Sequence, residues 1–421
     1  MKIPGFYFGA KKTMEKSVVH KEKQDFKEFH WVLKNAHSHK FYEFSFDMDD
    51  FPNIRIRNII NLEETGLRFE DNKISGITMV SNVYHLGIEF YHTGDEKNIE
   101  IKNVDLFVNA DPKDLWKNIP GDPGDIFYKP YDISYQGKFL DKKIVVTSKR
   151  GRSHAHEGKF REDDFAVNEL PADWCIVSVS DGAGSAKAAR EGSRVATASV
   201  NGFFNSSEVL AELDNNINII YTPEDSTKDK DEARRNVIRT LYEGVLFTYT
   251  ALDKTAIDHD LSIIDLHATL IFALVKKFSF GYIILSFGVG DCPVTLISTG
   301  FSEVQLLNRM DVGEFSGGTR FITMKDIFND QMAARFSITC VNDFAYLVLM
   351  TDGIYDPKFS TENKLEDRES WRTFFNDLAG HNDDSAKVDF INDTGIDVQL
   401  SLWADFWSRG NHDDRTLAII Y

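Results

Sequence analysis

The chain has 421 residues, of which 42% are hydrophobic and 27% are charged, which is ordinary for a soluble globular protein of one or two domains. Its formal net charge of −18, from 48 basic and 66 acidic residues, argues against a nucleic-acid partner, because the phosphates would be repelled. No apolar run reaches the roughly 18 residues that a membrane span needs, and the start, "MKIPGFYFGAKKTMEK", lacks the apolar core of a secretory signal. Cys175, Cys292 and Cys340 each stand alone in an apolar run, which is typical of a reducing compartment and predicts a cytoplasmic protein.

The N-terminal part of the chain, residues 1–118, predicts an all-β sandwich. Its segments, "KFYEFSFDMDDF", "NIRIRNIINL", "SGITMVSN", "YHLGIEFYH" and "NIEIKNVDLFVN", alternate apolar and polar residues with turn signals between them. The stretch "VNADPKDLWKNIP" resembles the end of an immunoglobulin-like bacterial module. Residues 119–139, with their prolines and glycines, predict an exposed connector to a second domain, 140–421.

Strands and long helices mix after the connector. We expect helices over 185–204 and 232–254, each with an apolar stripe at helical spacing, and a mobile polar loop between them. The expected strands are 143–148, 164–169, 174–180, 268–275, 280–288, 293–298, 335–341, 345–350 and the closing "RTLAIIY".

Carboxylates stand at the ends of five of these strands. In "WCIVSVSDGAGS" an apolar strand runs straight into Asp181 and Gly182, and "AYLVLMTDGIYD" repeats the pattern. A dinucleotide-binding loop would need a third glycine where Lys187 stands, and Asp181 would repel a pyrophosphate, so the nucleotide interpretation fails. A single Asp-Gly is most simply a turn. Five strand-end carboxylates together are costly without cations, and their oxygen ligands favour Mg²⁺ or Mn²⁺ over zinc.

In their order along the chain, "EDDFAV", "SDGAGS", "HATL", "GVGDCPV", "TDGIYD" and "DDRTLAII" resemble the motifs of the metal-dependent protein phosphatases of type 2C. The resemblance covers residues from about 140 to 421. It implies an α+β fold, a four-layer αββα sandwich of two antiparallel sheets flanked by helix pairs, with two Mn²⁺ or Mg²⁺ ions at one end.

The resemblance also implies roles for individual residues. Asp181 is expected to bridge the two ions, and the Gly182 carbonyl to bind one of them. Asp352 and Asp413 are expected to complete the shell of the second ion. The other expected ligands are Asp163 and Asp164, the acidic pair that holds metal-bound waters, and Asp291, which helps bind a third, weakly held ion.

The sequence leaves three alternatives for the residue that binds phosphate. In the family an arginine lies a few residues before the acidic pair, and here that region, "RGRSHAHEGKFREDD", offers Arg152, Lys159 and Arg161. The register of the pair, 162–163 or 163–164, is open for the same reason. The second register is preferred, because the strand then starts directly after the pair.

The general acid stays open as well. Some members of the family carry a histidine directly after the Asp-Gly, where this chain has Ala183. His154 and His156 form an HxH with no third histidine nearby, which favours loop histidines over a zinc site. His154 remains a candidate proton donor. In the segment 300–334, where the family carries its variable flap, "EFSGG" predicts a mobile loop that contacts substrate.

The resemblance implies a bacterial-type signalling hydrolase, a serine/threonine protein phosphatase in which two metal ions activate a bridging water that attacks phosphorus. Its partners would be a phosphorylated protein and a cognate serine/threonine kinase, with no nucleic acid and no membrane. Two alternatives remain: a non-catalytic phosphatase-like scaffold that binds a phosphorylated partner, and a small-molecule phosphatase. The full carboxylate set speaks against the scaffold.

Overall fold

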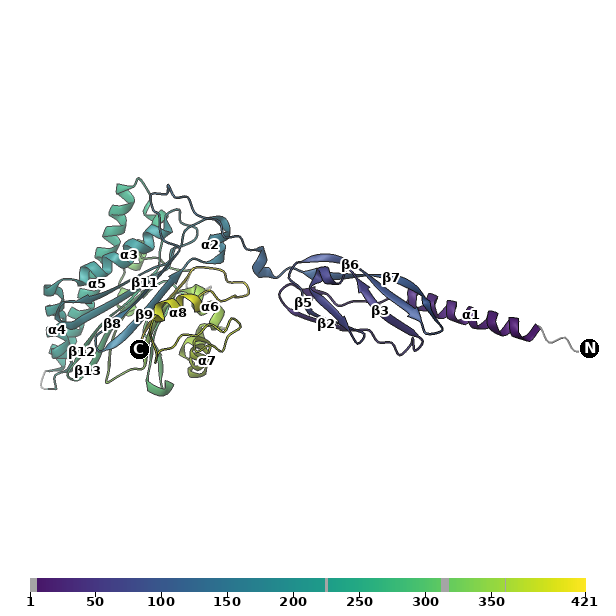
Figure 1. Ribbon diagram of the computed structural model, residues 1–421. Coiled ribbons are helices and arrows are strands. Elements are labelled where there is room, and N and C mark those ends of the chain that lie inside the picture. The colour runs from purple at the N-terminus through teal and green to yellow at the C-terminus, as the bar shows by residue number, and fades with distance from the viewer. Residues whose placement is uncertain (1–5, 224–225, 312–317, 360) are drawn as a thin grey trace, which may run out of the picture. The chain divides into compact units, whose positions relative to one another are not determined.

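The computed structural model describes residues 6–223, 226–311, 318–359 and 361–421 (Figure 1). The chain is a mixed α+β protein with two compact units, divided between Trp116 and Lys117. Each unit encloses its own hydrophobic core. Among the described residues, no helix combines the length and the apolar character needed to cross a membrane.

In the part of the first unit that the structure describes, helix α1 (Phe6–Glu28) comes first and is followed by strands in two sheets. The strands are β1 (Ala36–His37), β2 (Phe41–Ser45), β3 (Ile54–Ile60), β4 (Leu67–Glu70), β5 (Lys73–Ile77), β6 (Asn82–His92) and β7 (Asp95–Asn109). One sheet has the order β1-β7-β6-β3 and the other β2-β5-β4. Every strand pair in them is antiparallel except β1 with β7.

Helix α1 makes the prediction of an all-β first unit wrong. Near its end, Phe26 is fully buried and packs against Phe51 and Phe90. Lys23 forms an ion pair with Asp95, with 3.0 Å between Nζ and the nearer carboxylate oxygen. The sequence "KKTMEKSVVHKEKQDFKE" did not indicate this helix, because charged residues dominate it and its few apolar residues form no clear stripe.

The second unit contains a five-stranded sheet, β10-β11-β12-β13-β16, and a six-stranded sheet, β15-β14-β17-β18-β9-β8, in which all strand pairs are antiparallel. The strands are β8 (Asp132–Phe139), β9 (Lys142–Lys149), β10 (Asp164–Leu170), β11 (Trp174–Ser180), β12 (Leu270–Phe278), β13 (Gly281–Val289), β14 (Val294–Ile297), β15 (Val304–Leu306), β16 (Phe336–Val341), β17 (Tyr346–Met350) and β18 (Arg415–Ile420). The helices are α2 (Arg152–Glu157), α3 (Ala189–Phe204), α4 (Ser207–Tyr221), α5 (Thr227–Asp258), α6 (Asp352–Lys358), α7 (Arg368–Leu378) and α8 (Ile396–Trp403).

Three layers of apolar side chains hold this unit together. One joins the two sheets and includes Val177 and Ile271 from one sheet, and Val146 and Ile420 from the other. A second layer lies between the five-stranded sheet and helices α3, α4 and α5. A third lies between the six-stranded sheet and helices α6, α7 and α8. Because both faces of each sheet are covered, the central strands read as continuous apolar runs, and all nine strands expected from the sequence of this unit are confirmed.

The loop expected between the two long helices is largely helical. Residues of "DNNINIIYTPEDSTKDKDE" complete α4, and the polar tail forms the first turns of α5. Ser226 caps α5 by accepting a hydrogen bond from the Asp229 N–H. This N-cap, together with the acidic first turn, explains why so polar a stretch is helical.

The expected connector, 119–139, also differs from the structure, because it lies within the second unit. Its last eight residues form the edge strand β8, paired with β9. Lys129 is only 4% exposed and forms an ion pair with Asp164, at 2.9 Å. Before β8, the segment follows two turns along the second unit, with most of its prolines and glycines exposed but with Phe127 and Lys129 buried. It is therefore an ordered part of that unit, where an exposed connector between two domains was expected.

This packing predicts where the second unit can be cut from the chain. A fragment that starts at Lys117 is expected to unfold cooperatively in calorimetry. A fragment that starts at residue 136 loses half of β8 and leaves Asp164 buried without Lys129, which costs about 3–5 kcal/mol. We expect it to melt far lower or to aggregate. Equal melting temperatures of the two fragments would contradict the packing described above.

Candidate active site

The acidic site of the second unit lies where ends of both sheets meet. Strand β11 ends directly before Asp181, and β10 begins directly after Asp163. In the other sheet, β17 is followed by Thr351 and Asp352, and β18 is preceded by Asp413. Because Asp164 pairs with Ser180 in one sheet and Met350 with Leu417 in the other, these strand ends are in register and bring their carboxylates to the same edge.

Mutual electrostatic effects show that five carboxylates form one cluster. Burial raises the pKa of Asp181 well above its usual value, and the charges of Asp352, Asp163, Asp413 and Asp291 raise it further. Burial also raises the pKa of Asp352, again with contributions from Asp413, Asp291 and Asp163. Asp181 and Asp352 each interact with the other four carboxylates, so all five lie close together.

Three oxygens of this cluster have no hydrogen-bond donor. Among the described residues, the Oδ1 atoms of Asp163, Asp291 and Asp352 are buried and unpartnered. The Oδ2 atom of Asp163, by contrast, accepts hydrogen bonds from the hydroxyls of Thr351 and Thr416, at 2.8 and 2.7 Å. Buried carboxylate oxygens without donors are costly unless a cation binds them. The donor set therefore fits hard divalent cations such as Mg²⁺ or Mn²⁺.

One sulfur lies beside these oxygens. Cys292 Sγ and carboxylate oxygens of Asp181 and Asp291 all lie within 4.8 Å of one another. Cys292 is fully buried and near Thr269 Oγ1, at 3.4 Å. It was expected to be a core residue and is one, but its place directly after Asp291 was the signal that it borders the site.

The contacts of Asp164 and Glu162 bear on the register of the acidic pair, for which 163–164 was preferred. Asp164 is held by Lys129, and its Oδ1 accepts the Phe165 N–H, so it is paired outside the cluster. Glu162 is 5% exposed, and its Oε2 lies 3.6 Å from Nε2 of His154. Burial raises the pKa of Glu162 to about 7. The geometry therefore favours the pair 162–163 over the pair 163–164.

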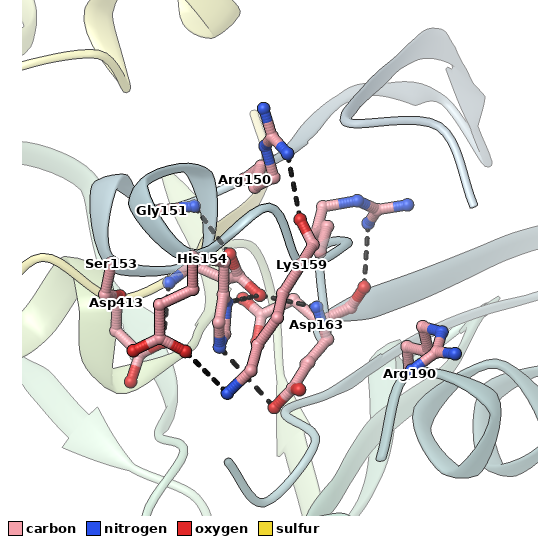
Figure 2. Close-up of polar contacts among 12 residues, drawn as sticks. Arg150, Gly151, Ser153, His154, Lys159, Asp163, Arg190 and Asp413 are labelled. Carbon is pink, nitrogen blue, oxygen red and sulfur yellow. Dashed lines mark hydrogen bonds and ion pairs between the residues drawn. The ribbon is translucent and has the colours of Figure 1, made fainter. Parts of the chain in front are cut away.

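His154, on the short helix α2, lies inside the site (Figure 2). Its Nδ1 is 2.9 Å from Oδ2 of Asp414, and Asp414 also accepts the backbone N–H groups of Gly151 and Glu162. Burial opposes the charged imidazole and the Asp414 carboxylate favours it, and the balance raises the pKa of His154 to about 9. The Asp414 carboxylate thus favours the charged form of His154 beside the cluster, whereas its neighbour Asp413 belongs to the cluster itself.

The three basic residues considered for phosphate binding differ in their exposure and in their partners. Arg161 is 1% exposed and donates hydrogen bonds to the Asp163 carbonyl and to Ser148 Oγ. Because its guanidinium group is enclosed and already bonded within the protein, the structure speaks against its expected role in phosphate binding. Arg152 donates to the Asp405 carbonyl at 2.9 Å. Lys159 is half exposed and forms an ion pair with Glu157. Figure 2 shows Lys159 beside His154.

Two glycines allow the main chain to approach closely at the site. A Cβ atom at Gly182 would lie 2.8 Å from the Ala189 carbonyl oxygen, and one at Gly353 would lie 1.9 Å from the Asp414 carbonyl oxygen. The Asp-Gly pairs of the sequence therefore serve close packing as well as the site. The loop "EFSGG" expected to contact substrate falls almost entirely on 312–317, outside the described residues.

The second unit contains the part of the chain that matches a known protein family. The family described as Protein phosphatase 2C matches residues 150–393, a segment that ends before Asp413 and β18. No curated protein matches the chain. Similar solved structures include the S. agalactiae serine/threonine phosphatase, at 12% identity and a TM-score of 0.39, with 69% of this chain and 99% of that chain covered.

Two further structures are similar. The Mycobacterium tuberculosis serine/threonine phosphatase PstP/Ppp has 13% identity and a TM-score of 0.37, with 66% and 97% coverage. RsbX in complex with magnesium has 14% identity and a TM-score of 0.35, with 68% and 98% coverage. At these values the structural likeness assigns no substrate or partner. The family match, however, spans more than half of the chain, and the protein therefore belongs to the protein phosphatase 2C family.

Proposed function

We propose that the protein hydrolyses phosphoserine and phosphothreonine in proteins, with two Mn²⁺ or Mg²⁺ ions bound at the acidic end of a four-layer αββα sandwich. The observation that carries the proposal is the set of three buried carboxylate oxygens without donors, on Asp163, Asp291 and Asp352. A binding-only scaffold would gain nothing from such a cluster, because its mutual repulsion destabilises the fold.

The cluster offers a ligand for each ion. Asp181, on which the charges of the other four carboxylates act, would be shared by the two ions, and the Gly182 carbonyl would bind one of them. Asp352 and Asp413 would hold one ion. The pair 162–163 would act through bound water, and Asp291 would hold a third, weaker ion. When bound, the ions supply the Lewis acidity that lowers the pKa of an attacking water and neutralises charge on the phosphoryl group.

The protein's own groups would handle the rest of the reaction. His154 is held in its charged form by Asp414, so it can donate a proton to the departing serine or threonine oxygen. Arg152 or Lys159 would be the basic side chain that binds phosphate, after exchanging its present partner, Asp405 or Glu157, for the phosphoryl group. The substrate would be the product of a serine/threonine kinase, in the cytoplasm, where Cys175, Cys292 and Cys340 stay reduced.

Metal removal tests the proposal directly. Hydrolysis of a small phosphate ester and of phosphoserine peptides is expected to need added Mn²⁺ or Mg²⁺ and to stop with EDTA. Zn²⁺ is not expected to restore it, because an oxygen-ligand site suits hard ions. A panel of phosphoserine, phosphothreonine and phosphotyrosine peptides, with free sugar phosphates as the small-molecule comparison, defines the substrate class. Full activity in a metal-stripped sample would rule the mechanism out.

A further inference from the structure

We call residues 117–131 the clamp segment, because they pack onto the loop that leads to the acidic pair. The Ile119 N–H donates to the Ala155 carbonyl at 2.8 Å, and Tyr131 stacks on Phe160, with 5.8 Å between ring centroids. The side chain of Phe127, in the middle of the segment, belongs to the buried core beneath α3. The clamp segment is thus an ordered part of the second unit, and it directly follows the first unit in the chain.

Lys129 carries the most unusual contact of this segment. Its ammonium group is buried and lies 2.9 Å from the Asp164 carboxylate. It also donates to the Asp163 carbonyl at 2.7 Å, and to the Arg190 carbonyl and Ser193 Oγ, both at 3.1 Å. One buried cation therefore joins the clamp segment, the start of β10 and the first turn of α3.

The Lys129 ammonium group is also linked to Glu162, the other member of the acidic pair, through the Ser193 hydroxyl. The Ser193 hydroxyl donates to the Glu162 carbonyl, so the main chain of both 162 and 163 is held by this network. The hydroxyls of Thr351 and Thr416, by contrast, donate hydrogen bonds to the Asp163 carboxylate and not to its main chain. A buried ammonium costs several kcal/mol unless its partners are well placed. The ammonium group of Lys129 has four such partners: the Asp164 carboxylate, the Asp163 and Arg190 carbonyls, and the Ser193 hydroxyl.

We propose that Lys129 is a positioning residue of the metal centre: it holds the main chain of Glu162 and Asp163 so that their carboxylates face the ions. The inference rests on the proposed function, because it takes Asp163 as part of that centre. Groups that orient metal ligands without touching the metal typically change its affinity about 10- to 100-fold when removed. Asp164, which lies outside the cluster, serves in this network as the counter-ion of Lys129.

The test measures Mn²⁺ affinity of the full chain by titration, with free Mn²⁺ read from its electron paramagnetic resonance signal. Lys129→Met is expected to weaken Mn²⁺ binding by about 10- to 100-fold. The matched control is Lys276→Met, which removes another largely buried lysine, paired with Asp214 at 2.6 Å. Lys276 lies opposite Trp174, at the end of the sheet away from Asp181. The Lys276→Met variant should have a lower melting temperature than the parent but the same Mn²⁺ affinity.

Two further variants separate positioning from charge and from folding. Asp164→Asn leaves Lys129 its contacts with the Asp163 carbonyl and Ser193, so Mn²⁺ affinity should match that of the parent. The double variant with Lys129→Met and Asp164→Asn removes both buried charges and should recover stability. Its Mn²⁺ affinity should stay as low as that of Lys129→Met, which keeps the test decisive if the single variant does not fold.

Parent-like Mn²⁺ affinity in Lys129→Met or in the double variant would overturn the inference. So would an equal loss in Lys276→Met, which would make the effect one of stability, or in Asp164→Asn, which would make it one of charge. Failure of the parent to bind Mn²⁺ is a separate outcome, because it would overturn the proposed function and the inference with it.

Discussion

Replacing Asp181 with asparagine is expected to lower phosphopeptide turnover by at least about 100-fold, the scale of losing a principal electrostatic contributor. The charges of four other aspartates act on Asp181, and we propose that the two ions share its carboxylate. Asparagine is nearly the same size but carries no charge. Steady-state turnover and Mn²⁺ titration on the same samples measure both parts of the effect.

Without metal ions, the same substitution is expected to stabilise the fold. Burial and like charges raise the pKa of Asp181 in the folded state, so its ionised form destabilises the fold. That cost is full above the folded pKa, decreases as the pH falls toward the unfolded pKa, and is absent below it. At neutral pH in EDTA, Asp181→Asn should therefore melt higher than the parent. Asp141→Asn is the control, because Asp141 lies at the turn between β8 and β9, at the far end of β9 from the site. Parent-like turnover in Asp181→Asn would refute the shared-ligand assignment.

The strand-end carboxylates could be predicted because their information is local. An apolar run that leads into Asp-Gly indicates both the end of β11 and the carboxylate that stands there, and the same is true of β17. Five such ends were enough to expect one cluster. The distinction between Asp163 and Asp164 was not local, since it depends on Lys129, which is distant in sequence and lies in a stretch that was interpreted as an exposed connector.

Burial of charged groups was the other limit. Arg161 carries the charge that phosphate binding needs, and only the packing of β9 and of the Asp163 main chain shows that its guanidinium is enclosed. Helix α1 was missed for a related reason. Its attachment depends on Phe26 and on ion pairs such as that of Lys23, whereas helix prediction depends on a repeated apolar face.

Substituting alanine at Gly353 tests the close approach of α6 to the segment before β18. The added methyl group would lie 1.9 Å from the Asp414 carbonyl oxygen, a contact that only a main-chain shift can relieve. Overpacking of this kind costs about 3 kcal/mol, and we expect the melting temperature of the second unit to fall by roughly 5 to 10 °C. Since Asp352 begins this helix and Asp413 precedes the clashing carbonyl, Mn²⁺ affinity should fall as well.

Gly202→Ala provides a matched control of opposite sign. Gly202 lies in α3, and a Cβ atom there would meet nothing within 4 Å, so alanine should stabilise the helix by up to about 1 kcal/mol. Calorimetry of the two variants in EDTA separates the steric effect from metal binding. If Gly353→Ala melted as high as Gly202→Ala, the main chains of α6 and the Asp413–Asp414 segment could not be as close as described. The cluster would then have to be held together by the ions alone. A large fall in Gly353→Ala would show instead that the packing of glycine against the main chain brings Asp352 and Asp413 together before any ion binds.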